Sequence, residues 1–235
     1  MTLPVVILAG GLATRLRPLT ATIPKALIEV AGEPFAHHQL RLLARKGVTR
    51  VVYCVGYLGE LIVDAVGDGR RFGLDVRYVF DGEKLLGTGG TIAHALPVIG
   101  DRFLILYGDS YLDVDYQKVA AAFLASGQPA LMTVYANEGR WDTSNVEYDG
   151  REVIRYSKTA RNERMRHIDY GLGAAHKSIF EALPRGIAID LAAIYERLAS
   201  EGKLAAFEVF HRFYEIGSSL GIQELEAKLL GQAKE

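Results

Sequence analysis

The sequence predicts an α/β protein, a three-layer sandwich with a mostly parallel central sheet and a small antiparallel β insertion. Two observations predict this fold class. In the first half, short runs of consecutive apolar residues alternate with segments of helical periodicity. That alternation is expected of strands buried on both faces of a sheet and joined by right-handed crossovers. Between residues 137 and 176, shorter segments are broken by turn residues such as Asp149 and Gly150, which is typical of antiparallel hairpins.

The first half contains four predicted strands with helices between them. The strands are expected at residues 5–8, 50–55, 74–80 and 103–107, and the helices at 35–46, 58–66 and 87–96. Gly47 and Pro97 follow two of these helices and are expected to end them. Ligands bind at the carboxyl ends of parallel strands. We therefore expect Gly10-Gly11 and Gly108-Asp109 to meet at one edge of the sheet.

The second half changes character. Helices are expected at residues 119–124, 189–199 and 218–230, and strands at 130–135, 145–148, 153–156, 205–210 and 213–216. Asp115 is expected to introduce the first of these helices, and Ser218 is a predicted N-cap of the last one.

Composition limits the classes of function. A chain of 235 residues suits one large α/β domain, or one domain with a small appendage. Lys and Arg total 27 and Asp and Glu total 28, a balance that argues against a nucleic-acid partner. The single cysteine, Cys54, lies in an apolar run, so we expect a core position and no intrachain disulfide. Without an apolar span of about 18 residues or a signal-peptide pattern, we expect no membrane partner and a cytoplasmic location.

The loop after the first strand has the character of an anion site. Small residues that follow the strand let a backbone approach a ligand closely, and the nearby Arg15, Arg17 and Lys25 supply positive charge. The loop matches neither the G-x-x-x-x-G-K-[ST] motif nor the G-x-G-x-x-G motif. Taken alone, the two glycines also fit an ordinary strand-to-helix turn.

Asp109 is the sharpest single candidate for chemistry. It follows the apolar strand at residues 103–107, at the same predicted edge as the Gly10-Gly11 loop. A carboxylate there can hold a hard cation such as Mg²⁺, which favours oxygen ligands and substrate phosphates. A helix cap or turn aspartate is the alternative interpretation.

The string at residues 8–20, LAGGLATRLRPLT, followed by Pro24-Lys25, is much more specific than the glycines alone. It resembles the signature of the sugar-1-phosphate nucleotidyltransferases, L-A-G-G-x-G-T-R-L-x-P-L-T followed by P-K. One departure is Ala13, which stands where the family usually has glycine. The resemblance extends over almost the whole chain and implies the Rossmann-like nucleotide-diphospho-sugar transferase fold, in which the antiparallel insertion forms the acceptor pocket. Without hexapeptide repeats, the chain is similar to the minimal, single-domain branch that includes heptose 1-phosphate guanylyltransferases and N-acetylmuramate 1-phosphate uridylyltransferases.

The resemblance implies roles for the first half of the chain. The nucleotide-binding residues would be Leu8, Ala9, Gly10, Gly11 and Thr14 at the phosphates, and Gly87, Thr88 and Gly89 near the base. Arg15 would stabilise the departing pyrophosphate and Lys25 the reacting phosphates. Asp109, in a segment similar to the family's G-D element, would be a ligand of the cofactor Mg²⁺. Glu215 would be the second metal ligand, since Glu215-Ile216-Gly217-Ser218 stands where the family has D-I-G-[TS].

The resemblance also implies an acceptor pocket in the second half. Its residues would be Asn145, Lys158, Asp169 and Gly171. Ser157 and Asp169 replace residues that usually touch sugar hydroxyls, which suggests altered recognition. The basic stretch from Arg161 to His167 fits either a solvated loop or an extra anion clamp.

The implied function is Mg²⁺-dependent transfer of a nucleotidyl group from a nucleoside triphosphate to a sugar 1-phosphate. Residues 1–235 would form a single domain, with a nucleotide-binding half at 1–115 and an acceptor-binding half at 116–235. Monomer and homodimer both remain open. Three alternatives are a cytidylyltransferase acting on a non-sugar phosphate such as phosphocholine, a degenerate nucleotide-binding regulatory module, and a dehydrogenase, which the missing glycine fingerprint disfavours.

Overall fold

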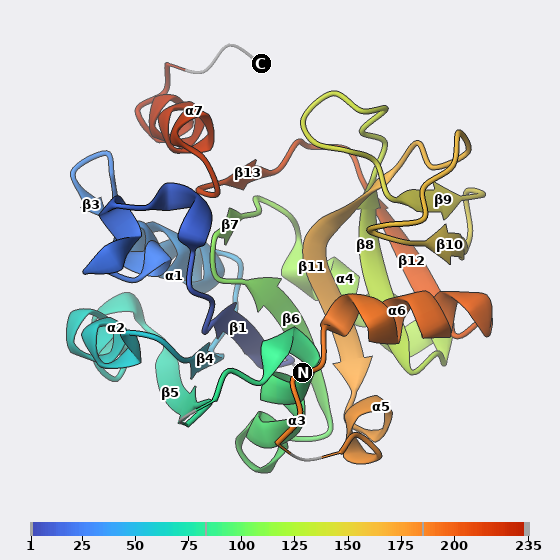
Figure 1. Ribbon diagram of the computed structural model, residues 1–235, viewed down its shortest axis with the longest axis horizontal. Coiled ribbons are helices and arrows are strands. Elements are labelled where there is room, and N and C mark those ends of the chain that lie inside the picture. The colour runs from blue at the N-terminus through green and yellow to red at the C-terminus, as the bar shows by residue number, and fades with distance from the viewer. Residues whose placement is uncertain (1, 83, 185, 233–235) are drawn as a thin grey trace.

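A seven-stranded sheet runs through the centre of the molecule (Figure 1). The computed structural model describes residues 2–82, 84–184 and 186–232, except for the side chain of Arg15. The strand order is β12-β8-β11-β6-β1-β4-β5. In chain order these strands are β1 (Val5–Ala9), β4 (Arg50–Val55), β5 (Asp75–Phe80), β6 (Arg102–Tyr107), β8 (Ala130–Tyr135), β11 (Ile168–His176) and β12 (Leu204–Val209). Strands from both halves of the chain therefore belong to one sheet.

The sheet is mixed, and one strand reverses its direction. β5, β4, β1 and β6 are parallel neighbours, and β12 is parallel to β8. β11 lies between β6 and β8 and is antiparallel to both. The sequence predicts only short hairpin strands in this region, so β11 is a strand that the prediction lacks. Its small residues, including Gly171 and Gly173, interrupt the run of large apolar residues that identifies the other strands. Residue 173 is a glycine because a Cβ there would clash with the Tyr195 hydroxyl.

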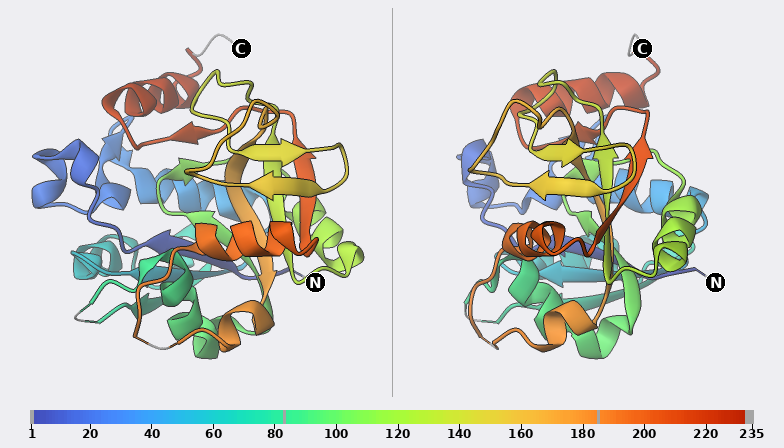
Figure 2. Two further views of the ribbon diagram at one scale, coloured as in Figure 1. Left: turned by 45° about the vertical axis from the view of Figure 1, so that its right-hand side comes forward. Right: turned by 90° about the vertical axis from the view of Figure 1, so that its right-hand side faces the viewer.

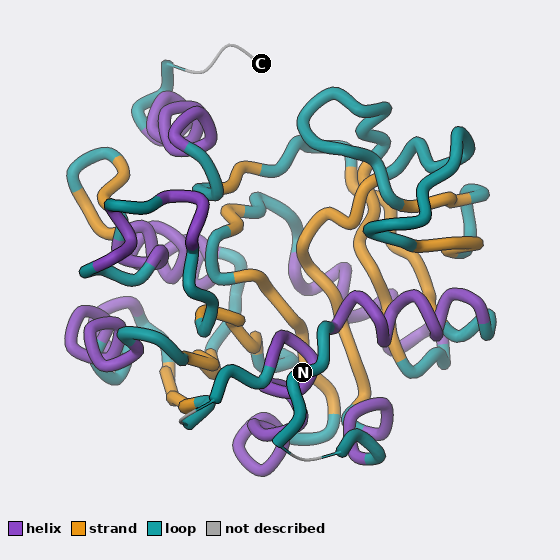
Figure 3. The backbone as a smooth tube through the Cα atoms, viewed as in Figure 1, coloured by secondary structure: helices purple, strands orange, loops and turns teal. Residues whose placement is uncertain are grey.

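Helices cover both faces of the sheet and complete the three-layer sandwich that the sequence predicts (Figure 3). One face carries α1 (Phe35–Arg45), α2 (Gly59–Val66) and α4 (Tyr116–Ser126), and the other carries α3 (Gly87–Ile99), α5 (Ser178–Glu181) and α6 (Leu191–Ser200). β1 shows why its apolar residues are consecutive. Val5 and Ile7 pack with the first group of helices, whereas Val6 packs with the second.

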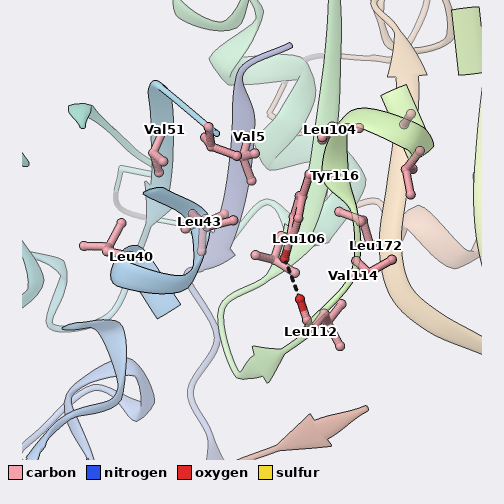
Figure 4. Packing of buried hydrophobic residues seen from close by; sticks show 14 of the residues in the cluster. Val5, Leu40, Leu43, Val51, Leu104, Leu106, Leu112, Val114, Tyr116 and Leu172 are labelled. Carbon is pink, nitrogen blue, oxygen red and sulfur yellow. Dashed lines mark hydrogen bonds between the residues drawn. The ribbon is translucent and has the colours of Figure 1, made fainter. Parts of the chain in front are cut away.

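The core beneath α1 and α4 is continuous (Figure 4). Leu40 and Leu43 of α1 lie over β1 and β4, and Tyr116 at the start of α4 lies beside β6. The buried Tyr116 hydroxyl donates to the Leu112 carbonyl at 3.3 Å. The N-cap predicted for this helix is confirmed, because the Asp115 side chain accepts from two backbone N–H groups of the first turn.

Smaller elements surround the sheet. They are the strand pairs β2 (Glu29–Val30) with β3 (Glu33–Pro34), β7 (Ser110–Tyr111) with β13 (Tyr214–Glu215), and β9 (Val146–Tyr148) with β10 (Val153–Tyr156). Short 3-10 helices span Thr14–Leu16, Leu19–Ala21, Lys25–Leu27 and Arg70–Phe72. Figure 2 shows the β9–β10 hairpin on the same side of the sheet as α6, which confirms the predicted antiparallel insertion.

α7 (Ser219–Leu229) closes the fold against the N-terminal half. Its Leu225 is buried with Phe35 and Leu42 of α1. The Ser218 side chain accepts from the Gly221 N–H, so the predicted N-cap is confirmed. The prediction that Pro97 ends α3 is wrong. The helix continues to Ile99, since a proline this close to the helix end removes only one hydrogen bond.

Candidate active site

A cavity of about 270 Å³ lies at the carboxyl ends of β1 and β6. Among the residues that line it are Leu8, Ala9, Gly10, Gly11, Lys25, Gly87, Thr88 and Asp109. These come from the end of β1 and the loop after it, the 3-10 helix Lys25–Leu27, the start of α3 and the residues after β6. The topological expectation that Gly10-Gly11 and Gly108-Asp109 meet at one sheet edge is therefore confirmed.

Glycines let the backbone segments around the cavity approach one another. A Cβ at Gly108 would lie 2.7 Å from the Leu8 carbonyl oxygen, and one at Gly10 would lie 3.2 Å from Asp81 Oδ2. Gly11 differs, because nothing lies within 4 Å of the position that its Cβ would take. Packing thus accounts for Gly108 and Gly10, whereas the absent side chain of Gly11 leaves free space at the cavity.

Ala13 adopts a left-handed backbone conformation, with φ 46° and ψ 43°. The Thr20 hydroxyl donates to the Ala13 carbonyl at 2.8 Å and helps to hold this turn. An L-residue with a side chain pays about 1–2 kcal/mol for that conformation, whereas glycine does not. The departure from the family pattern therefore introduces backbone strain next to the cavity.

Lys25 and Asp109 form a close ion pair inside the cavity. Lys25 Nζ lies 2.6 Å from Asp109 Oδ2, and the two side chains are 22% and 29% exposed. The short 3-10 helix that begins at Lys25 places the lysine, and the end of β6 places the aspartate. The Ser110 hydroxyl lies 3.4 Å from Asp109 Oδ1. A cation and an anion from opposite ends of the first half are thus held together at the sheet edge.

The chain brings Glu215 next to Asp109. β7 pairs with β13 so that Glu215 stands opposite Ser110, and the Ile216 N–H donates to the Asp109 carbonyl at 3.0 Å. The Glu215 carboxylate folds back over Gly217, where an added Cβ would lie 2.6 Å from Oε2. No group of three or more His, Cys, Asp or Glu side chains with metal-site geometry occurs among the described residues. Mg²⁺ is usually held by one or two carboxylates together with phosphates and waters, so a third protein ligand is not required. Glu215 itself is not among the residues that line the cavity.

The start of α3 serves both the cavity and the packing of the two halves. Gly87 and Thr88 line the cavity. Gly89 is buried behind them, where its N–H donates to the Ile189 carbonyl at 2.8 Å and an added Cβ would lie 2.8 Å from Ile194 Cδ1. The glycines at 87–90 are therefore explained in large part by the close approach of the loop before α6.

The remaining residues predicted at the phosphates lie elsewhere or are not described. Thr14 is exposed in its 3-10 helix and is not among the residues that line the cavity. The side chain of Arg15 lies outside the described part of the chain.

The four predicted acceptor residues come together around β9, β10 and β11, outside the lining of the 270 Å³ cavity. Asn145 Oδ1 accepts from the Asp169 N–H at 3.0 Å, and Asp169 Oδ1 accepts from the Gly171 N–H at 3.0 Å. Burial raises the pKa of Asp169 to about 6. The Gly171 N–H and the positive charge of Lys158 favour the ionised form and lower this pKa, but burial outweighs them. Gly171 has φ 98°, a conformation that favours glycine.

Tyr107 connects these residues with the cavity. Its side chain lines the cavity. Burial is the main cause of the raised pKa of the Tyr107 hydroxyl, and the negative charge of Asp169 is the second cause. The Tyr107 hydroxyl is buried and has no hydrogen-bond partner among the described residues. Tyr107 Cδ2 also lies 3.6 Å from the position of a Cβ added at Gly171, so this side chain borders both the cavity and one of the predicted acceptor residues.

Sequence reasoning missed Asp81, Leu85, Thr91 and Tyr107, which also line the cavity. Asp81 follows the end of β5, and its Oδ1 accepts from the Thr91 hydroxyl at 2.5 Å. The rule that located Asp109, a polar residue directly after a parallel strand, would have found Asp81 as well.

The basic stretch 161–167 is partly paired with acidic side chains. Arg164 Nη1 lies 3.7 Å from Glu147 Oε1, and His167 Nε2 lies 3.5 Å from Glu208 Oε1. Arg161 and Arg166 are exposed. Of the two interpretations of this stretch, the pairing agrees better with a solvated loop.

Residues 4–145 match the model of a family described as nucleotidyl transferase. The chain belongs to this nucleotidyl transferase family, and the enzyme class expected from the sequence is confirmed. It is 30% identical over 227 residues to the N-acetylmuramate alpha-1-phosphate uridylyltransferase of Neisseria meningitidis serogroup B, covering 94% of this chain and 96% of that relative. It is 33% identical over 151 residues to the glucose-1-phosphate thymidylyltransferase of Streptomyces antibioticus, covering 63% of this chain and 42% of that longer relative.

Solved structures agree with this family. HddC from Yersinia pseudotuberculosis superposes with a TM-score of 0.79 at 25% identity, over 97% of this chain and 100% of HddC, and a second HddC structure contains GMP-PN. A structure described as a putative glucose-1-phosphate thymidylyltransferase from Bacillus anthracis has a TM-score of 0.83 at 20% identity, over 100% of this chain and 97% of that one. The latter supports the fold alone. No helix in the described ranges is long and apolar enough to cross a membrane.

Proposed function

We propose that this protein transfers a nucleotidyl group from a nucleoside triphosphate to a sugar 1-phosphate and releases pyrophosphate. The observation that carries the proposal is the meeting of the Gly10-Gly11 loop, Lys25 and Asp109 in one cavity at the carboxyl ends of β1 and β6. Nucleotide phosphates need backbone groups and fixed cations in a concave site, and this cavity combines both. The relatives named above, the uridylyltransferase and the thymidylyltransferase, carry sugar 1-phosphates in their names, which favours a sugar phosphate as acceptor.

In this proposal the phosphates bind at residues 10–15 and the base lies near Gly87 and Thr88. The first half, 1–115, carries the nucleotide and the second half, 116–235, carries the acceptor. Asp109 and Glu215 would hold Mg²⁺, which neutralises charge on the reacting phosphate when bound. Lys25 contributes positive charge close to Asp109, and Arg15 stabilises the pyrophosphate that leaves.

The chemistry requires little covalent work from the protein. An ionised oxygen of the sugar 1-phosphate attacks the α-phosphorus, the bond from that phosphorus to the bridging oxygen breaks, and pyrophosphate departs. The attacking oxygen needs no general base, because the phosphate is already ionised. Residues of the site act by holding the two phosphates in line and by offsetting their negative charge.

A substrate panel tests the proposal. Each nucleoside triphosphate, including dTTP, is combined with a set of sugar 1-phosphates or with phosphocholine, with Mg²⁺, and pyrophosphate release is measured. We expect release only with a sugar 1-phosphate, and none above background with Asp109→Asn. Turnover of CTP with phosphocholine alone would identify the non-sugar transferase instead. Nucleotide binding without turnover of any acceptor would identify a regulatory module.

A further inference from the structure

A loop from the second half of the chain grips the start of α3 beside the cavity. The Ile189 N–H donates to the Leu86 carbonyl at 2.8 Å, and the Ile189 carbonyl accepts from the Gly89 and Gly90 N–H groups at 2.8 and 3.2 Å. A Cβ at Gly87 would lie 2.7 Å from the Ile189 carbonyl oxygen. The loop therefore lies closer to α3 than a side chain at Gly87 would permit.

Asp190, the next residue of this loop, uses its two carboxylate oxygens on different sides. Oδ1 accepts from the Thr88 hydroxyl at 3.0 Å and from the Ala192 N–H at 2.9 Å. The Thr88 hydroxyl in turn accepts from the Leu191 N–H at 2.8 Å. Oδ2 lies 3.8 Å from Lys158 Nζ. A single carboxylate thus connects a residue that lines the cavity with a lysine that follows β10.

The charge of Lys158 is shared between two acidic groups. It acts on Asp169, whose ionised form it favours, and on Asp190. Partial burial acts to raise the pKa of Asp190, but the Ala192 N–H, Lys158 and the Thr88 hydroxyl together outweigh it and hold that pKa below its usual value. Asp190 is therefore ionised at neutral pH, and Lys158 has a fixed negative partner.

The interactions of Asp190 differ in whether they need that charge. Asparagine caps a helix about as well as aspartate, and its amide oxygen also accepts from a hydroxyl. Only the interaction with Lys158 depends on the negative charge. The Lys158 and Asp190 side chains are 46% and 58% exposed, and exposed ion pairs contribute little to stability. The main effect of this ion pair is therefore to fix the position of the Lys158 side chain, and not to stabilise the fold.

We propose that Asp190 is a positioning residue that couples the cavity-facing start of α3 to Lys158. Through Thr88 and Asp190, a nucleotide bound at α3 would order Lys158. The family resemblance implies that this lysine contacts the phosphate of the sugar 1-phosphate. This inference rests on the proposed function for the identity of both ligands. The loop before α6 would then position Lys158 in addition to packing against the start of α3.

Steady-state kinetics with Asp190→Asn test the coupling. The acceptor is the sugar 1-phosphate that the substrate panel identifies. We expect its KM to rise about 3- to 5-fold, as for loss of one partly exposed charge pair, with kcat and the nucleotide Kd changed less than about twofold. Lys158→Met should raise this KM about tenfold or more, through loss of a charge-assisted contact with phosphate. The double variant should match Lys158→Met alone, because Asp190 acts through the lysine.

Asp115→Asn is a matched control. Asp115 also N-caps a helix, and its Oδ2 lies 3.6 Å from a lysine, Lys118, but α4 lies away from the cavity. This variant should have the KM of the wild-type enzyme. An unchanged KM in Asp190→Asn, an equal rise in Asp115→Asn, or additive effects in the double variant would each overturn the inference.

Hydrogen exchange separates a failure of this inference from a failure of the proposed function. Exchange is measured with and without a nonhydrolysable nucleoside triphosphate analogue, which requires binding but no turnover. In the wild type, the analogue should slow exchange at residues 87–91 and also at 157–159, and Asp190→Asn should retain only the first effect. Equal protection at 157–159 in both proteins overturns the coupling. Absence of pyrophosphate release by the wild type would refute the transferase reaction. The exchange experiment would still show whether Asp190 couples nucleotide binding to residues 157–159.

Discussion

Replacing Lys25 by methionine removes one positive charge from the cavity and keeps most of the side chain's apolar stem. Lys25 Nζ lies 2.6 Å from Asp109 Oδ2, and its side chain is only 22% exposed, so solvent screens this charge weakly. Loss of one preorganised charge contact to a reacting group typically costs about 2.7–4 kcal/mol in the transition state. We therefore expect kcat for pyrophosphate release to fall about 10²- to 10³-fold.

The control for this experiment is Lys46→Met. Lys46 Nζ lies 2.5 Å from Asp113 Oδ1 at the end of α1, so this variant also loses a close lysine–aspartate pair, but one outside the cavity lining. It should retain near wild-type turnover. Both variants are unfolded in urea, so that a loss of activity caused by unfolding is recognised. More than about a tenth of wild-type kcat in folded Lys25→Met would refute the role that we assign to this charge.

Three further predictions follow from the backbone and from one buried carboxyl group. Ala13→Gly should raise the free energy of unfolding in urea by about 0.5–1 kcal/mol, because it relieves a left-handed alanine; a decrease would contradict that conformation. Asp169 has a pKa of about 6 in the folded protein, against an ordinary value of 3.8 for the unfolded chain, so the folded state binds this proton more tightly. The contribution of Asp169 to the free energy of unfolding therefore becomes unfavourable as the pH rises from about 4 to 6. The shift corresponds to about 3 kcal/mol, and partial exposure reduces this to about 2 kcal/mol. Asp169→Asn should gain this amount at pH 8 and little at pH 4 in urea titrations, and a pH-independent difference would argue against a pKa of Asp169 that burial raises. Gly89→Ala should lower the melting temperature, since its Cβ would lie 2.8 Å from Ile194 Cδ1. Gly11→Ala should leave the melting temperature nearly unchanged and weaken nucleotide binding, and equal melting losses in both variants would contradict this division.

The part of the fold built from long apolar runs could be predicted from the sequence. β1, β4 and β6 can be located because both faces of each strand are covered by helices, which requires consecutive apolar residues. β5 lies at the edge of the sheet and is more exposed, so its sequence mixes apolar residues with Asp75 and Arg77. β11 was not located, because Gly173 is required by the approach of Tyr195 and interrupts that pattern. The reason for this glycine is a tertiary contact, which the local sequence does not contain.

The candidate site was predictable to a similar degree. The edge rule correctly brings Gly10, Gly11 and Asp109 together, and the resemblance adds Lys25. The grip of Ile189 on the start of α3 was not foreseeable, because it depends on a loop distant in the chain. For the same reason, the sequence predicts for the stretch 87–90 a helix start and contacts to a base, and does not indicate the packing against this loop.

The pairing of β7 with β13 has a consequence for how the protein becomes active during its synthesis. The Ile216 N–H meets the Asp109 carbonyl, and Leu225 covers Phe35 and Leu42, all of which are translated much earlier. A nascent chain on the ribosome therefore carries an uncovered apolar patch, and an unfinished site, until residues 214–229 have left the exit tunnel. Translation that stops short of this segment should yield a product that binds chaperones and cannot turn over its substrates.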